Sequence, residues 1–374
     1  MAYVISAGTS IPRCHVDQKE AAVFAREMFK DSFKDIDRLL SAFQNGEIAS
    51  RQFVMPLDWY KEAKSFKEKN QTYIDMAVRH SAEAVSNCLS DDRFLKKEIP
   101  CGKIDAIFFI SSTGISTPSI EAKLMNILPF SKRAKRIPIW GLGCAGGASG
   151  IARAFEYCKA FPKAHVLVIA AELCSLTFQK DDQSKSNLIG TSLFGDGIAA
   201  LLMCGKEADF SEARFEVLPE VLGSQSSTLE DSEEVMGWEI NDNGFRVVFS
   251  RDIPTLIKTH LKNDIEAFLN KEHYRFGEHS SISGPPWRKK SSRRLYGNPW
   301  IFRSAHRLFT KNFGQARQYV IGHCDACFKG ILLAWRPRAG KIRSLRGART
   351  GLFIGAAALE MDKKRVTDTC FGRF

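Results

Sequence analysis

Continuous apolar runs alternate with helix-like segments over the first three quarters of this chain, and this alternation restricts the fold more than any other feature. Residues 104–110, 165–170 and 198–203 are rich in apolar side chains, as in strands that are buried on both faces. Residues 73–89 instead carry apolar side chains at the spacing of one helix face. The alternation predicts a layered α/β architecture.

The same order of elements continues to about residue 278. The further predicted elements are strands at 137–140 and 245–249 and helices at 120–128, 151–160 and 255–269. Residues 209–236 are polar and turn-rich, as in a connection between two halves. The chain thus divides into a first half over 1–208, a linker with the start of a second half over 209–278, and a tail over 279–374.

Composition indicates a protein of the cytosol. No apolar run approaches the roughly 18 residues that a membrane span requires. The N-terminus has neither a basic segment nor a long apolar region, so we expect no secretory signal. The ten cysteines follow no framework spacing, which suits thiols in a reducing compartment. We therefore expect cytoplasmic localisation and no membrane-spanning segment.

Charge is distributed unevenly along the chain. Residues 1–278 hold 34 Lys+Arg and 38 Asp+Glu, a balance of −4, whereas residues 279–374 hold 20 and 4, a balance of +16, which together give the net charge of +12. A jump of this size ordinarily indicates a basic tail for nucleic acid or for an acidic surface. The family motifs described below indicate a different origin for this basic tail.

The strongest local pattern surrounds Cys144. A predicted strand ends at Trp140, glycines form a turn, and a helix is predicted to start near Ala148. Cys144 then lies at a helix N-terminus, where the macrodipole and free backbone N–H groups favour the reactive thiolate. The neighbouring glycines leave room for a bulky acyl thioester. The alternative is a buried structural cysteine in a glycine-rich turn, and the residues alone leave both interpretations open.

Five segments of the chain form an ordered set. They are Thr113-Gly-Ile-Ser-Thr-Pro-Ser, Gly141-Leu-Gly-Cys-Ala-Gly-Gly-Ala, Glu172-Leu-Cys-Ser-Leu-Thr-Phe178, Leu193-Phe-Gly-Asp-Gly-Ile-Ala-Ala200, and Gly237-Trp-Glu through Arg251-Asp-Ile-Pro254. Together they resemble the type III polyketide synthases, the chalcone and stilbene synthase family, over about three quarters of the chain.

The resemblance implies a thiolase-like layered αβαβα fold, a homodimer and an acyltransferase. Cys144 would take an acyl group from a coenzyme A thioester, and malonyl-CoA would lose carbon dioxide and attack that thioester. Acyl-CoA and malonyl-CoA would be the substrates. The resemblance implies no metal site and no bound cofactor.

The resemblance also assigns two residues beside the substrate cavity. Phe178 matches a gatekeeper phenylalanine between the tunnel and the cavity, although an ordinary core aromatic is the alternative. Val247 stands where the family has a second phenylalanine. The smaller side chain implies a wider cavity. We therefore expect a fatty acyl starter that gives an alkylpyrone or alkylresorcinol, rather than a coumaroyl starter.

The resemblance stops in the tail. The family also needs a histidine and an asparagine in its second half, in segments such as AHPGG and HGNMSSAT, followed by a GFGPG-type loop. No such segment follows Phe276, and His279, His306 and His323 lie in other contexts. We therefore expect a thiolase-like second half that is incomplete after about residue 278.

A shifted reading frame explains the tail. Codons that encode Gly284-Pro-Pro-Trp-Arg-Lys can give Ala-His-Pro-Gly-Gly when they are read one nucleotide forward. The same shift can turn residues 315–323 into Lys-His-Gly-Asn-Met-Ser-Ser-Ala and residues 348–355 into Leu-Gly-Pro-Gly-Phe-Ser-Ser. Three family motifs in one phase and in family order are hard to obtain by chance. We therefore attribute the basic tail to translation out of frame and expect an impaired enzyme.

Two other functions would use parts of the same pattern. A β-ketoacyl synthase of the third type would condense carrier-protein thioesters, but residues 193–200 and the context of Phe178 favour the polyketide synthases. A non-catalytic protein with a basic tail would bind nucleic acid, but the tail has no interleaved motif. Cys324 and Cys327 lack the second pair that a structural metal site needs. We expect neither nucleic-acid nor metal binding.

Overall fold

The computed structural model describes residues 1–45, 48–216, 218–271 and 351–356. Within these ranges a seven-stranded mixed sheet runs in the order β11-β8-β1-β7-β6-β4-β5. Its strands are β1 (Ala2–Ser10), β4 (Ala106–Ser111), β5 (Lys135–Trp140), β6 (His165–Leu173), β7 (Asp196–Gly205), β8 (Glu220–Ser226) and β11 (Gly351–Ala356).

The centre of the sheet consists of strands that are buried on both faces. β4 pairs parallel with β5 and β6, whereas β7 pairs antiparallel with β6 and β1. Every residue of β4, β6 and β7 is buried. This burial confirms the three strands that were predicted from continuous apolar runs.

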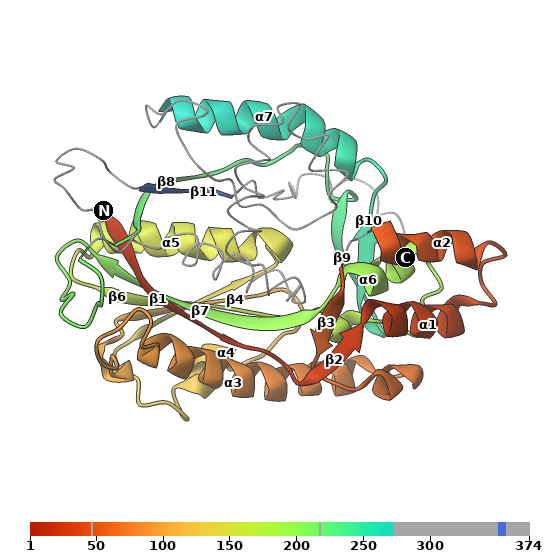
Figure 1. The fold of residues 1–374 in the computed structure, drawn as a ribbon, viewed down its shortest axis with the longest axis horizontal. Helices are drawn as coiled ribbons and strands as arrows, with labels where there is room; N and C mark the ends of the chain where they lie inside the picture. Colours follow the sequence, from red (N-terminus) through yellow and green to blue (C-terminus); the bar gives the residue numbers. More distant parts are fainter. Residues whose placement is uncertain (46–47, 217, 272–350, 357–374) are drawn as a thin grey trace, which may run out of the picture.

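Five layers follow one another across the molecule (Figure 1). Helix α3 (Phe66–Ser90) packs on one face of β1, β6 and β7, and α5 (Gly146–Ala160) lies on the other side of these strands. Strand β8 pairs with β1 at Ala2 and Tyr3, at the start of that strand, and from there β8 and β11 lie beyond α5. Helix α7 (Ile253–Lys271) lies outermost. The order helix, strands, helix, strands, helix confirms the predicted αβαβα layering.

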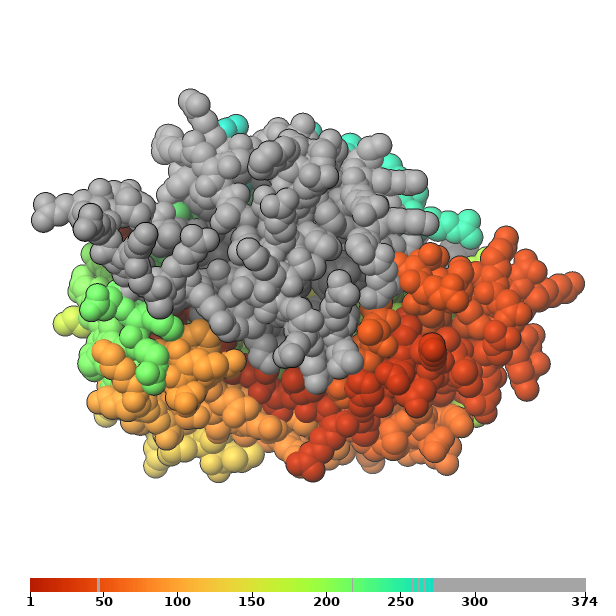
Figure 2. Space-filling model, in the orientation of Figure 1, coloured from red at the N-terminus to blue at the C-terminus, as the bar shows by residue number. Residues whose placement is uncertain are grey.

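Helices α1 (Gln18–Phe29) and α2 (Ile36–Asn45) lie at one end of these layers. Figures 1 and 2 both show them at that end of the molecule. The remaining elements are β2 (Cys14–Asp17), β3 (Ser50–Phe53), η1 (Leu57–Lys61), η2 (Cys101–Lys103), α4 (Ile120–Leu124), η3 (Gly143–Ala145), η4 (Cys174–Thr177), α6 (Lys185–Leu193), β9 (Met236–Asn241) and β10 (Gly244–Phe249).

The structure differs from the sequence prediction in several elements. Helix α3 starts seven residues before the predicted 73–89, because Ser65 and Glu68 form a capping box at its N-terminus. Helix α4 ends at Leu124 rather than at 128. Strand β8 lies inside the stretch 209–236 that was predicted as a connection, and β11 lies inside the tail, where no strand was predicted.

Most of the tail lies outside the described residues. His279, His306, His323, Cys324 and Cys327 lie outside the described residues. The shifted-frame motifs also fall there, apart from the part of the third that coincides with β11. No helix within the described ranges is long and apolar enough to cross a membrane.

Candidate active site

Cys144 occupies the turn between β5 and α5. Gly141 and Gly143 have positive backbone φ angles of 88° and 51°, a conformation that favours glycine. Cys144 follows in η3, two residues before α5 begins at Gly146, and its side chain is exposed. The predicted place at a helix N-terminus is therefore confirmed, and the buried structural cysteine is not observed. The nucleophilic role of Cys144 stays a prediction.

Three loops meet at one edge of the sheet near this turn. The carboxyl ends of the parallel strands β4, β5 and β6 point to the same edge, and Ser111 lies opposite Trp140 in the register of β4 and β5. The Trp140 Nε1–H donates a hydrogen bond to the Gly114 carbonyl at 3.0 Å. The loop after β4 therefore lies beside the loop that carries Cys144.

Glu172 places a buried carboxyl group at the same edge. It accepts hydrogen bonds from the Ser112 N–H at 3.2 Å, from the Ser112 hydroxyl at 3.0 Å and from the Thr113 hydroxyl at 2.9 Å. Burial raises the pKa of Glu172 to about 7, and these hydrogen bonds oppose the rise. No role was predicted for Glu172 from the sequence, although an acid at the end of an apolar run is a signal of a buried carboxyl group.

Asp196 explains part of the Leu193–Ala200 motif. This buried first residue of β7 accepts hydrogen bonds from the Val54 N–H at 2.8 Å and from the Ser175 N–H at 2.7 Å. Burial raises the pKa of Asp196 to about 6, and hydrogen bonds from Ser175 and Val54 lower it in part. The carboxyl group thus holds η4 and the chain after β3 against the start of β7.

Phe178 lies directly after η4 and packs toward α1. Its ring centroid lies 5.5 Å from that of Phe24, 6.4 Å from that of Phe29 and 6.5 Å from that of Tyr60. This half-buried position in an aromatic cluster fits the alternative of a core aromatic. The gatekeeper role of Phe178 stays a prediction.

Val247 lies on β10 beside a different phenylalanine. A Cβ added at Gly190 would lie 3.2 Å from the Phe194 ring and 3.5 Å from Val247 Cγ1, so these two side chains border the same glycine. The Phe194 ring also lies 5.8 Å from Trp238 and 5.7 Å from Phe249, measured between centroids. Phe194 was quoted in the Leu193–Ala200 motif but given no role.

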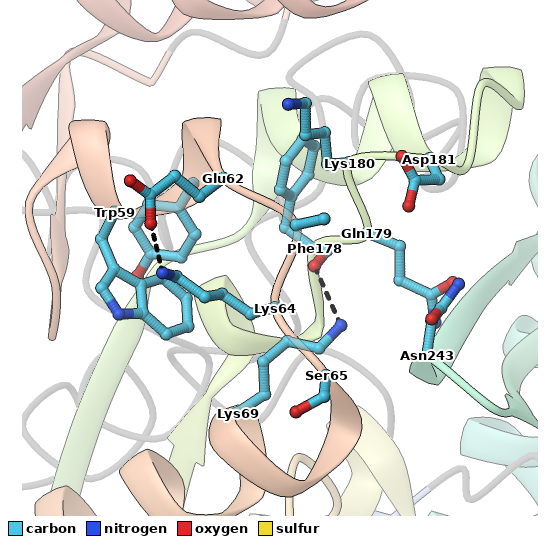
Figure 3. Close-up of a pocket in the computed structure, with 12 residues that line it drawn as sticks. Trp59, Glu62, Lys64, Ser65, Lys69, Phe178, Gln179, Lys180, Asp181 and Asn243 are labelled. Atoms are coloured by element: carbon cyan, nitrogen blue, oxygen red, sulfur yellow. Dashed lines mark hydrogen bonds and ion pairs between the residues drawn. The ribbon is translucent and has the colours of Figure 1, made fainter.

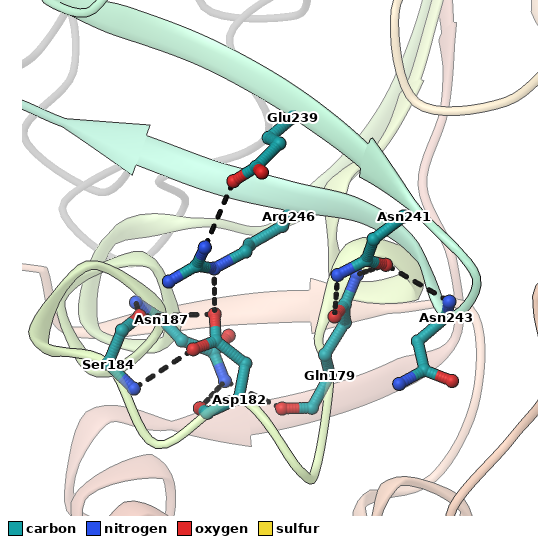
Figure 4. Close-up of polar contacts among 8 residues, drawn as sticks. All are labelled: Gln179, Asp182, Ser184, Asn187, Glu239, Asn241, Asn243 and Arg246. Atoms are coloured by element: carbon teal, nitrogen blue, oxygen red, sulfur yellow. Dashed lines mark hydrogen bonds and ion pairs between the residues drawn. The ribbon is translucent and has the colours of Figure 1, made fainter. Parts of the chain in front are cut away.

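Polar contacts fix the β9–β10 hairpin against the loop after η4 (Figure 4). The Gln179 amide donates a hydrogen bond to the Asn241 side chain at 3.1 Å. Arg246 forms ion pairs with Glu239 at 3.0 Å and with Asp182 at 3.6 Å. The Phe245 ring lies 6.1 Å from the Trp140 ring, so the hairpin also reaches the end of β5.

Substitution of Gly150 is expected to disrupt the packing of α5 against β4 and β6. An added Cβ would lie 2.5 Å from Ile110 Cδ1, 2.9 Å from Ile110 Cγ1 and 3.1 Å from Val168 Cγ1. Overpacking of this kind costs about 1–3 kcal/mol, so Gly150→Ala should lower the free energy of unfolding by that amount in denaturant titrations. Gly147→Ala is the matched control, because no described atom lies within 4 Å of its added Cβ. Equal stabilities of the two variants would contradict this packing.

Comparisons with known proteins place the chain in a family. Residues 1–207 match the family model of the chalcone and stilbene synthases, N-terminal domain. This chain belongs to the chalcone and stilbene synthase family. A protein of Bacillus subtilis (strain 168) provisionally named chalcone synthase is 59% identical over 290 residues, which cover 78% of this chain and 80% of that protein.

More distant relatives of this chalcone and stilbene synthase family member are also polyketide synthases. The 1,3,6,8-tetrahydroxynaphthalene synthase of Streptomyces peucetius subsp. caesius is 30% identical over 273 residues, covering 71% of this chain and 70% of that protein. The crystal structure of 1,3,6,8-tetrahydroxynaphthalene synthase from Streptomyces coelicolor A3(2), a bacterial type III polyketide synthase, matches with a TM-score of 0.73 at 22% identity over 89% of each chain. At that identity the structural likeness shows the fold.

Proposed function

We propose that this chain is a type III polyketide synthase that carries its acyl chain on Cys144. The Cys144 thiolate would attack an acyl-CoA thioester, forming a new thioester and releasing coenzyme A. Malonyl-CoA would then lose carbon dioxide, and the resulting enolate carbon would attack the Cys144 thioester. A carbon–carbon bond forms, the Cys144 thiolate leaves, and the extended acyl chain is then a thioester of coenzyme A. The observation that carries this proposal is the exposed Cys144 at the N-terminus of α5 in a chain of this family.

A shifted frame after about residue 278 would leave this enzyme impaired. The matches to the two relatives cover 78% and 71% of this chain, so part of the chain lies outside each match. Sequencing the gene across the codons for residues 276–283 tests the proposal. We expect a neighbouring frame that encodes Ala-His-Pro-Gly-Gly, and a gene without such a frame would rule the shift out.

Val247 supports a fatty acyl starter. Its side chain is smaller than a phenylalanine, and it borders Gly190 together with Phe194. We infer a wider cavity here than two phenylalanines would leave. A frame-restored chain should therefore use a fatty acyl-CoA in preference to coumaroyl-CoA, and Val247→Phe should reduce this preference. Equal use of the two starters by the unsubstituted chain would contradict the assignment.

Condensation of carrier-protein thioesters is the second candidate reaction. The relatives are named as chalcone or tetrahydroxynaphthalene synthases, which supports coenzyme A substrates. The frame-restored chain should form product with malonyl-CoA and little with malonyl-carrier protein. The reverse preference would favour the β-ketoacyl synthase.

We also propose a cytoplasmic homodimer. Strand β5 lies at the edge of the sheet in the described part of the chain, and Ile115, Ile127 and Trp140 expose 46%, 58% and 48% of their surface. Apolar exposure of this kind is typical of a surface that a partner covers. Sedimentation equilibrium of the frame-restored chain should give twice the mass of one chain, and the mass of a single chain would contradict the dimer.

A further inference from the structure

A buried lysine lies away from the loop that carries Cys144. Lys69, in the first turns of α3, is only 6% exposed. Its ammonium group carries three N–H donors. Among the described residues its ammonium group donates a hydrogen bond to the Phe178 carbonyl, at the long distance of 3.4 Å. Burial lowers the pKa of Lys69 to about 8, and the charge of Asp181, which also lines the pocket, opposes this shift. A buried ammonium group with one long hydrogen bond is costly, so Lys69 has donors to spare for a further anionic acceptor.

Lys69 lines a pocket of about 120 Å³ (Figure 3). The segment Trp59–Ser65 forms one wall, the chain at Phe178–Asp181 forms another, and Asn243 comes from the β9–β10 turn. Trp59 and Phe178 supply aromatic surface. No residue of the Cys144 turn lines this pocket.

Several other polar groups of the pocket are already paired. Lys64 forms an ion pair with Glu62, and the Ser65 hydroxyl donates a hydrogen bond to Glu68 at 2.7 Å. The Gln179 side chain exchanges hydrogen bonds with Asn241. Three lysines and two acids line the pocket, namely Lys64, Lys69, Lys180, Glu62 and Asp181. The lining is therefore positive by one charge, and Lys69 is its most deeply buried cation.

We propose that this pocket binds a small organic carboxylate, with the carboxylate on the Lys69 ammonium group and the apolar part against Trp59 and Phe178. The carboxylate supplies the acceptors that Lys69 lacks. The volume is close to the roughly 150 Å³ of a cavity that admits benzene, so a body of about one ring fits. The aromatic walls favour an organic anion over a hydrated phosphate ion. The site does not include the Cys144 turn.

The binding experiment uses the full chain and sodium benzoate as the probe. Benzoate should raise the midpoint of thermal unfolding relative to sodium chloride at equal ionic strength, because a ligand that binds the folded state stabilises it. Lys69→Met should abolish this shift. Lys67→Met, an exposed lysine on the same helix, should retain it. An equal shift in Lys69→Met, or an equal or larger shift with sodium phosphate, would overturn the assignment.

Reductive methylation of the unsubstituted chain gives a test that needs no variant. Benzoate at ten times its dissociation constant should slow methylation of Lys69 by about tenfold, because the fraction of unoccupied sites falls by that factor. Methylation of Lys67 should keep its rate. Peptide mass spectrometry measures both rates in one sample. Unchanged methylation of Lys69 in benzoate would overturn the site, whatever the condensation activity of the chain.

Discussion

Restoring the reading frame from about residue 279 is expected to raise product formation by at least about 10²–10³-fold over the chain as written, which is the effect of one oxyanion donor. The family resemblance assigns a histidine and an asparagine to the enolate that forms when malonyl-CoA loses carbon dioxide. The written tail has Pro285 and Pro286 where the proposed shifted frame would place the histidine codon, and Gln318 and Tyr319 where it would place the asparagine codon. Losing both donors costs little more than losing one, because groups that act as a unit are not additive.

The measurement is pyrone and resorcinol yield from a fatty acyl-CoA and labelled malonyl-CoA. A frame-restored chain in which the histidine of Ala-His-Pro-Gly-Gly is replaced by alanine is the matched control, because its tail is otherwise in frame. This control should fall back toward the activity of the chain as written. Equal yields from the written and restored chains would refute both the shifted frame and the roles of the missing pair.

Cys144→Ala in the frame-restored chain is expected to abolish condensation, with a loss of at least about 10³-fold, because no other group would hold the acyl intermediate. The substitution should leave folding intact, since the Cys144 side chain is exposed and the turn is set by Gly141 and Gly143. Cys101→Ala is the control, because Cys101 lies in η2, away from the β5–α5 turn.

Product yield and the midpoint of thermal unfolding should be measured on the same preparations. Cys101→Ala should keep both values close to those of the frame-restored chain. Cys144→Ala should keep the unfolding midpoint and lose the product. Product from Cys144→Ala at the unsubstituted rate would show that the acyl chain is carried elsewhere.

The elements that the sequence predicted are those with a strong local pattern. β4, β6 and β7 are buried on both faces, so their apolar runs identify them without tertiary information. β8 was missed because its sequence, Glu-Val-Leu-Gly-Ser-Gln-Ser, has no sustained alternation or apolar run. Its pairing depends on β1 and on β11, which is more than 120 positions later in the chain. Such distant pairing leaves little local signal.

The position of Cys144 in the candidate active site was predictable, whereas the surroundings of the buried acids were not. The turn that carries Cys144 is set by neighbouring glycines with positive φ angles, which are visible in the local sequence. The position of Cys144 could therefore be predicted from its neighbours. The partners of Glu172 and Asp196 come from distant strands and turns, so their burial and raised pKa values follow from tertiary packing. Which phenylalanine borders Val247 likewise depends on packing, because Phe194 meets it across Gly190 on α6.

The mass of the acyl-enzyme shows directly whether Cys144 carries the acyl chain. The full chain as written is incubated with a fatty acyl-CoA, quenched in acid and digested, and the cysteine peptides are weighed. We expect one acyl group on the peptide that contains Cys144, because transfer of the acyl group depends on the exposed thiol at the start of α5 rather than on the tail. An acyl group on another cysteine, with the Cys144 peptide unmodified, would contradict it.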